Sequence, residues 1–118
     1  MKVIVAGSRS ITDGCLVDWA IVESSFEITE LVSGGARGVD SLGEMWADRH
    51  NIPIRRFIPN WDLYGKSAGF LRNTEMTKYA EALIAIHDGK SRGTADMIQK
   101  AVGTGLKVFV KTDNPELF

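Results

Sequence analysis

Apolar positions along the chain gather into five short runs that polar, helix-patterned segments separate. Residues 2–6 and 82–86 are almost entirely apolar, which is typical of strands that are covered on both faces of a sheet. Weaker runs of the same kind lie at residues 29–33, 54–58 and 107–111. The pattern therefore predicts five strands.

Between these runs, apolar residues recur at intervals of three and four, as they do on one face of a helix. A first helix is expected after Asp13, which is a suitable N-cap. The other expected helices run from Val39 to about His50, from Ser67 as a cap to Tyr79, and from the segment after Asp88 to Gly103. Strands that alternate with helices through short loops imply right-handed crossovers and a parallel sheet. We therefore predict one α/β, Rossmann-like, doubly wound domain over residues 1–118, with strand order 3-2-1-4-5 and about four helices.

The composition excludes several classes of protein. The chain has 118 residues, 44% of them hydrophobic and 25% charged, which is ordinary for a globular protein and excludes intrinsic disorder and coiled coils. With 14 basic and 15 acidic residues the formal net charge is -1, which disfavours a dedicated duplex-DNA binder. Cys15 is the single cysteine, so an intrachain disulfide and a cysteine metal cluster are excluded, and a reducing cytoplasmic location is expected. No apolar run reaches membrane-spanning length, so no membrane partner is expected.

Glycines concentrate where a predicted strand ends and a helix begins. Carboxyl ends of parallel strands share one edge of the sheet, and ligands bind there where the strand order reverses. Each of the three glycine loops also carries an arginine, and Arg72 is expected on the same edge. The loop residues concerned are Gly7 and Arg9, then Gly34, Gly35, Arg37 and Gly38, then Gly89, Arg92 and Gly93. Glycine-lined helix starts with guanidinium groups favour phosphate, so the sequence predicts an anion site.

A phosphate loop of the Walker A type is excluded. Gly65-Lys66-Ser67 imitates the end of that motif, but Asn60 stands where the motif needs its first glycine. Trp61 and Tyr64 lie between these positions and would crowd a phosphate. Lys66 is kept as a ligand-binding candidate, and the two aromatic residues are candidates for stacking on a base.

Five motifs in order resemble one protein family. They are Gly7-Ser8-Arg9, Ser33-Gly34-Gly35-Ala36-Arg37-Gly38-Val39-Asp40, Gly65-Lys66-Ser67-Ala68-Gly69, Arg72-Asn73-Thr74-Glu75-Met76 and Asp88-Gly89-Lys90-Ser91-Arg92-Gly93-Thr94. The set resembles the YspA-related branch of the SLOG superfamily, small Rossmann-like proteins of bacteria and phages. The resemblance implies binding of a phosphorylated nucleoside or a nucleotide-derived ligand similar to AMP, ADP-ribose or NAD, in a sensor or ligand-binding role. The implied ligand and phosphate positions are Gly7, Ser8, Arg9, Gly34, Gly35, Arg37, Gly38, Asp40, Lys66, Arg72, Asn73, Ser91, Arg92, Gly93 and Thr94.

Two better-understood relatives imply alternatives. The LONELY GUY phosphoribohydrolases share an Arg-x-x-x-Met helix and a Gly-Thr loop, which implies a nucleotide N-glycosidase and a homo-oligomer. Their catalytic glutamate position is Met97 here, so the enzymatic hypothesis depends on other groups. These are Arg72, with Glu44 and Asp88 as weaker candidates and His87 as a weaker one still.

DNA-processing protein A shares the Ser-Gly-Gly-Ala-Arg-Gly-x-Asp segment, which implies binding of single-stranded DNA as a second alternative. Trp61 and Tyr64 would then stack on bases while Arg37 and Lys66 contact phosphates. The net charge makes nucleic acid the less favoured partner. No cofactor is required by any of these hypotheses, no metal site is predicted, and Mg²⁺ is expected only together with a phosphate.

Overall fold

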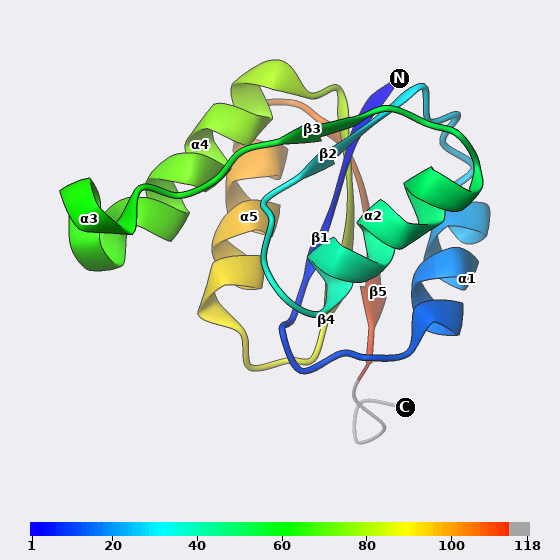
Figure 1. Cartoon of the computed structure of the whole chain (residues 1–118), viewed down its shortest axis with the longest axis horizontal. Coiled ribbons are helices and arrows are strands. Elements are labelled where there is room, and N and C mark those ends of the chain that lie inside the picture. Colours follow the sequence, from blue (N-terminus) through cyan, green and yellow to red (C-terminus); the bar gives the residue numbers. More distant parts are fainter. Residues whose placement is uncertain (114–118) are drawn as a thin grey trace.

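A five-stranded parallel sheet forms the centre of the computed structural model, which describes residues 1–113 (Figure 1). The strands are β1 (Lys2–Gly7), β2 (Glu30–Ser33), β3 (Ile54–Arg56), β4 (Ala82–His87) and β5 (Lys107–Thr112). Their order is β3-β2-β1-β4-β5, and all neighbouring pairs are parallel. The predicted strand number and order are confirmed, although β3 is shorter than the run that predicted it.

Four long helices cover the two faces of the sheet, and two short ones precede α4. They are α1 (Gly14–Ser24), α2 (Val39–Arg49), α3 (Trp61–Tyr64), the 3₁₀ turn η1 (Gly65–Ser67), α4 (Ala68–Tyr79) and α5 (Arg92–Gly103). Val3 and Val5 of β1 pack in the core beneath α1 and α2, whereas Ile4 and Ala6 pack in the core beneath α4 and α5. Because successive strand residues point to opposite faces, this double covering explains why β1 is apolar without interruption from Val3 to Ala6.

Of the two helix N-caps predicted from the sequence, one is confirmed and one is wrong. Asp13 Oδ1 accepts the backbone N–H of Cys15 at 2.9 Å, which confirms the predicted cap of α1. The predicted cap by Ser67 is wrong, because its side chain makes no capping bond to α4. The preceding η1 turn already provides a partner, since the N–H of Ala68 bonds the carbonyl of Gly65.

The segment from Pro59 to Gly65, which lies between the predicted third strand and third helix, contains α3. This helix projects beyond the edge of the sheet beside the start of α4 (Figure 1). Asn60 Oδ1 accepts the N–H of Leu63 at 3.1 Å and so caps the turn. Trp61, Leu63 and Tyr64 remain about half exposed or more, so this projecting turn is an apolar rim and not part of the core.

The strand order places a crevice between β1 and β4. The chain leaves β1 toward β2 on one side and later enters β4 on the other side, so the loops after these two strands diverge. No helix in residues 1–113 combines the length and apolar character needed to cross a bilayer.

Candidate functional site

A cleft of about 500 Å³ lies at this crevice, at the carboxyl edge of the sheet. Its walls come from the loops after β1, β2 and β4, from α3 and η1, and from α4 and the starts of α2 and α5. It brings together eleven residues that the sequence singled out. These are Gly7, Arg9, Asp40, Trp61, Lys66, Arg72, Asn73, Asp88, Ser91, Gly93 and Thr94.

A second, smaller concavity of about 240 Å³ adjoins the cleft, and we call it the arginine hollow. Three predicted residues, Gly34, Gly35 and Arg37, lie here and not in the cleft itself. The two spaces share a wall that consists of Arg9, Ala36, Trp61 and Arg72.

Besides Gly89 and His87, five predicted residues line neither space, and two of these five hold the glycine loops in place. The buried Ser8 Oγ accepts the backbone N–H of Asp88 at 3.0 Å and joins the β1 loop to the β4 loop. Gly38 has φ +74 and lies against the backbone of Ser8 and Arg9, so a side chain there is excluded both by conformation and by space.

The other three lie farther from the cleft. Glu44 accepts the hydroxyl of Ser33 at 2.6 Å and the Nε–H of Arg56 at 2.8 Å, so it links α2 to β2 and β3. Tyr64 is 51% exposed on α3 and does not line the cleft. Arg92 is exposed in the first turn of α5, outside both walls.

A buried acid and a half-buried base lie between the cleft and the hollow. Asp40 is 4% exposed, and burial raises the pKa of its carboxyl, against the opposing effects of the Ala36 N–H and the Arg72 charge. Burial lowers the pKa of Arg72, while Asp40 opposes this and Arg9 reinforces it. A Cβ on Gly34 would lie 2.5 Å from Nη1 of Arg72 and 2.8 Å from Oδ2 of Asp40. Glycine at this position is therefore what allows the guanidinium to lie over the β2 loop.

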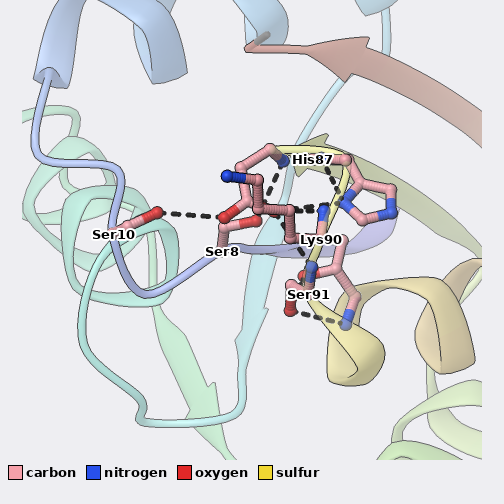
Figure 2. Close-up of polar contacts among 8 residues, drawn as sticks. Ser8, Ser10, His87, Lys90 and Ser91 are labelled. Carbon is pink, nitrogen blue, oxygen red and sulfur yellow. Dashed lines mark hydrogen bonds and ion pairs between the residues drawn. The ribbon is translucent and has the colours of Figure 1, made fainter.

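The loop after β4 is organised around Asp88, and Figure 2 shows where Ser8, Ser10, Lys90 and Ser91, which bond it, lie. Its Oδ1 accepts the backbone N–H groups of Lys90 at 2.8 Å and Ser91 at 3.0 Å, and its Oδ2 accepts the hydroxyl of Ser10 at 3.1 Å. These donors, the Lys90 N–H foremost, lower the pKa of Asp88 to about 2. The neighbouring His87 uses Nδ1 to accept the N–H of Gly89 at 3.2 Å and does not line the cleft.

The start of α5 faces the cleft with an ordered first turn. Ser91 Oγ caps the helix by accepting the N–H of Thr94 at 3.2 Å. The first N–H groups of a helix have no partner within it, and they carry its positive dipole end. Asn73 fixes α4 against this turn through Nδ2, which donates to Asp96 Oδ2 at 3.0 Å and to the Gly93 carbonyl at 3.3 Å.

More basic than acidic side chains line the cleft. Within residues 1–113, Arg9, Lys66 and Lys90 line the cleft without an ion-pair partner within 4.0 Å. Its two carboxylates, Asp40 and Asp88, are both occupied by internal contacts. The cleft therefore carries a local positive field in a chain whose formal net charge is -1.

Sequence reasoning missed several residues of the cleft. Lys90 lies inside a motif already singled out, so its charge was the available signal. Ser10, which also lines the cleft, directly follows the Gly7-Ser8-Arg9 motif. Phe70, 42% exposed, lines the cleft because of how α4 is rotated, which the sequence does not signal. Met97, which stands at the position of the LONELY GUY glutamate, also lines the cleft although it is buried.

Comparison with known proteins places the chain in a family. A family model described as the YspA, cpYpsA-related SLOG family matches residues 1–64. The "Gene 61 protein" of Mycobacterium phage D29 is 32% identical over 124 residues, which covers 97% of this chain and 98% of the relative. The chain belongs to the YspA, cpYpsA-related SLOG family. The resemblance inferred from the loop motifs is thus confirmed.

A solved structure supports the fold of this SLOG protein independently. DNA processing protein A (DprA) from Streptococcus pneumoniae superposes with a TM-score of 0.74 at 21% identity, over 92% of this chain. The match covers 49% of the DprA chain, so this chain spans about half of that length. At this identity the likeness establishes the Rossmann-like architecture alone.

In the part of the chain that the structure describes, no group of three or more His, Cys, Asp and Glu side chains is arranged to hold a metal ion. The cations and helix start that surround the cleft are suited to an anionic ligand directly.

Proposed function

We propose that this SLOG protein binds a phosphorylated nucleoside or nucleotide-derived ligand, similar to AMP, ADP-ribose or NAD, in the cleft at the carboxyl edge. One observation carries the proposal: a cleft of about 500 Å³ is lined by Arg9, Lys66, Arg72 and Lys90 while both of its carboxylates are internally occupied. This volume falls in the range of small-molecule sites, roughly 300–1,000 Å³. Four basic groups and the start of α5 favour phosphate, and membership of the SLOG family supports a nucleotide.

The position of the aromatic residues fits a nucleoside attached to that phosphate. Trp61, 49% exposed, and Phe70, 42% exposed, both line the cleft. Exposed aromatic side chains at a binding site offer flat apolar faces on which a base stacks. Tyr64, the other candidate for stacking, would need α3 to move before it could reach the cleft.

We favour binding without cleavage, in a sensor or ligand-sequestering role. Met97 stands where the LONELY GUY enzymes have their catalytic glutamate, and its buried thioether transfers no proton. The pKa of Asp88, lowered to about 2, leaves this carboxylate ionised and weakly basic at neutral pH. Glu44 lies beyond the cleft walls, and Asp40, the other carboxyl of the cleft, is 4% exposed and accepts the Ala36 N–H. An N-glycosidase would therefore depend on Arg72 and on a carboxyl that already bonds the protein.

The proposal is tested by titrating the purified protein with AMP, ADP-ribose, NAD and other mononucleotides, with adenosine as the ligand that lacks phosphate. Arg9→Ala removes one charge-assisted contact, which is worth about 1.5–3 kcal/mol, and is expected to weaken phosphorylated ligands by about tenfold or more. Arg49→Ala is the matched control, because Arg49 lies at the far end of α2 in a surface pair with Asp18. Equal affinity for adenosine and AMP, or equal effects of the two variants, would contradict the proposal.

Single-stranded nucleic acid is the second candidate, and the exposed Trp61 and Phe70 beside unpaired basic groups favour it. A short single-stranded oligonucleotide in the same titrations distinguishes the two. An oligonucleotide that binds more tightly than any mononucleotide, with affinity that falls steeply with salt, would support this candidate. Release of a free base from a bound mononucleotide would instead support the N-glycosidase.

A further inference from the structure

The arginine hollow is an extension of the cleft rather than an independent site. Its volume of about 240 Å³ is below the roughly 300–1,000 Å³ of sites that hold a whole ligand. Arg9, Ala36, Trp61 and Arg72 line both spaces, so the wall between them is a single layer of residues. A ligand in the cleft can therefore continue into the hollow past these shared side chains.

The lining of the hollow is more cationic than that of the cleft. Three of its nine lining residues, Arg9, Arg37 and Arg72, are arginines, and none is acidic. Within residues 1–113 Arg37 makes no ion pair, and Arg72 uses only two of its five N–H groups, toward Gly34 and Asn73. Guanidinium groups with free donors bind phosphate in a bidentate geometry.

The backbone of the hollow is already held in place. The hydroxyl of Ser33 accepts the N–H of Gly35 at 3.1 Å, and Asp40 Oδ2 accepts the N–H of Ala36 at 3.3 Å. The carbonyl of Ala36 in turn accepts the hydroxyl of Ser41 at 3.0 Å. A rim fixed in this way orders few groups when a ligand arrives, which favours affinity.

We infer that the ligand carries at least two phosphate groups and that the second occupies the arginine hollow. The inference rests on the proposed function and narrows its ligand to nucleoside diphosphates and pyrophosphate-bridged derivatives such as ADP-ribose. The first phosphate lies near Lys90 and the start of α5, and the second lies between Arg37 and Arg72. Arg9, in the shared wall, contacts the bridge between them.

The test compares ligands that differ by one phosphate in variants that differ by one cation. AMP and ADP, GMP and GDP, and ADP-ribose are titrated calorimetrically into the wild type, Arg37→Ala and Lys90→Ala, with Arg49→Ala as control. Arg37 lines only the hollow and Lys90 only the cleft. Arg37 is exposed and without polar partners in the described chain, so its replacement leaves the fold intact.

Each diphosphate is expected to bind about tenfold or more tightly than its monophosphate. Arg37→Ala should remove that advantage and leave the AMP and GMP affinities within about twofold of wild type. Lys90→Ala should lower the affinities for monophosphates and diphosphates by similar factors. Arg37→Lys, which keeps the charge without the planar fork, should restore part of the advantage.

The outcomes separate this inference from the function on which it rests. Equal affinity for AMP and ADP and for GMP and GDP in the wild type would overturn the second phosphate position and leave nucleotide binding standing. An equal loss for mono- and diphosphates in Arg37→Ala would overturn it as well. Absence of binding by every nucleotide would contradict the proposed function itself.

Discussion

Replacement of Asp88 by asparagine tests how much one carboxylate stabilises the folded conformation of the loop after β4. The asparagine keeps the size of the side chain and an oxygen that accepts the N–H groups of Lys90 and Ser91. It removes the negative charge and puts an amide nitrogen in place of one of the two carboxylate oxygens. The change therefore removes the charge and keeps the Oδ1 contacts with Lys90 and Ser91, while the contact with Ser10 is reversed so that the amide donates to the hydroxyl (Figure 2).

The magnitude follows from the pKa of Asp88, which the donors lower from 3.8 to about 2. Such a lowering corresponds to about 2.4 kcal/mol of additional stabilisation of the charged form in the folded state. Because 24% of the side chain is exposed to water that screens charge, we expect about 1–2 kcal/mol in practice. For 118 residues this corresponds to a melting temperature lower by about 4–8 °C.

The pH dependence has a definite sign. The unfolded chain protonates this carboxyl near pH 3.8 and the folded protein near pH 2, so the stabilisation is complete above the higher value. It declines as the pH falls, to about half at pH 3, and it is lost as the pH falls through about 2. Wild type and Asp88→Asn should thus differ most at neutral pH and converge in acid.

Urea denaturation of both proteins at pH 7, 5 and 3 measures the difference directly. Asp18→Asn is the control, since Asp18 forms a surface pair with Arg49, and its effect at pH 7 should be about 0.5 kcal/mol or less. If Asp88→Asn is as stable as wild type at pH 7, the reasoning is refuted. It is also refuted if the difference in the free energy of unfolding stays constant down to pH 3.

Three further predictions concern the walls of the cleft and of the arginine hollow. Gly34→Ala places a Cβ 2.5 Å from the guanidinium of Arg72 and 2.8 Å from the carboxylate of Asp40. It should lower the free energy of unfolding by about 1–3 kcal/mol and weaken nucleotide binding, and unchanged urea and calorimetric titrations would contradict it. Ser91→Ala removes the cap that accepts the N–H of Thr94 and should cost about 1 kcal/mol in urea denaturation; an unchanged midpoint would count against the cap. Because burial raises the pKa of Asp40, the stability that protonation of this group adds is complete below pH 3.8 and is lost as the pH rises through the raised value. As the pH rises through that value, Asp40→Asn should therefore become more stable relative to wild type. Denaturation at a series of pH values checks this. Free energies of unfolding that change with pH in parallel for the two proteins would contradict the expectation.

Much of the fold was predictable because its signals are local. The apolar runs of β1 and β4 reflect burial on both faces, and the connection rules for parallel strands leave a few common orders, of which β3-β2-β1-β4-β5 is one. The cap by Asp13 was predictable because it acts two residues away. The cap by Ser67 failed because the preceding η1 turn, which the sequence did not signal, already fills its role.

The site was predictable to the level of loops but not of side chains. Gly7, Arg9 and Gly93 follow from the rule that strand ends share one edge, so their presence in the cleft needed no further information. Arg92 and Glu44 show the limit of that rule. Both belong to helices beside the edge, yet one is exposed outside the cleft and the other is held by Ser33 and Arg56.

The sequence by itself determined the strand order, the edge at which a ligand would bind and the kind of charge that surrounds it. Tertiary structure decided that Arg72 lies over Gly34, 38 residues away in the chain, and that Ser8 and Ser10 bond the loop of Asp88, about 80 residues away. The physical reason is that loop position follows from chain connectivity, whereas the direction of a side chain depends on how each helix is rotated against the sheet. That rotation is set by the packing of residues such as Met76 and Met97 in the shared core, which only the folded chain brings together.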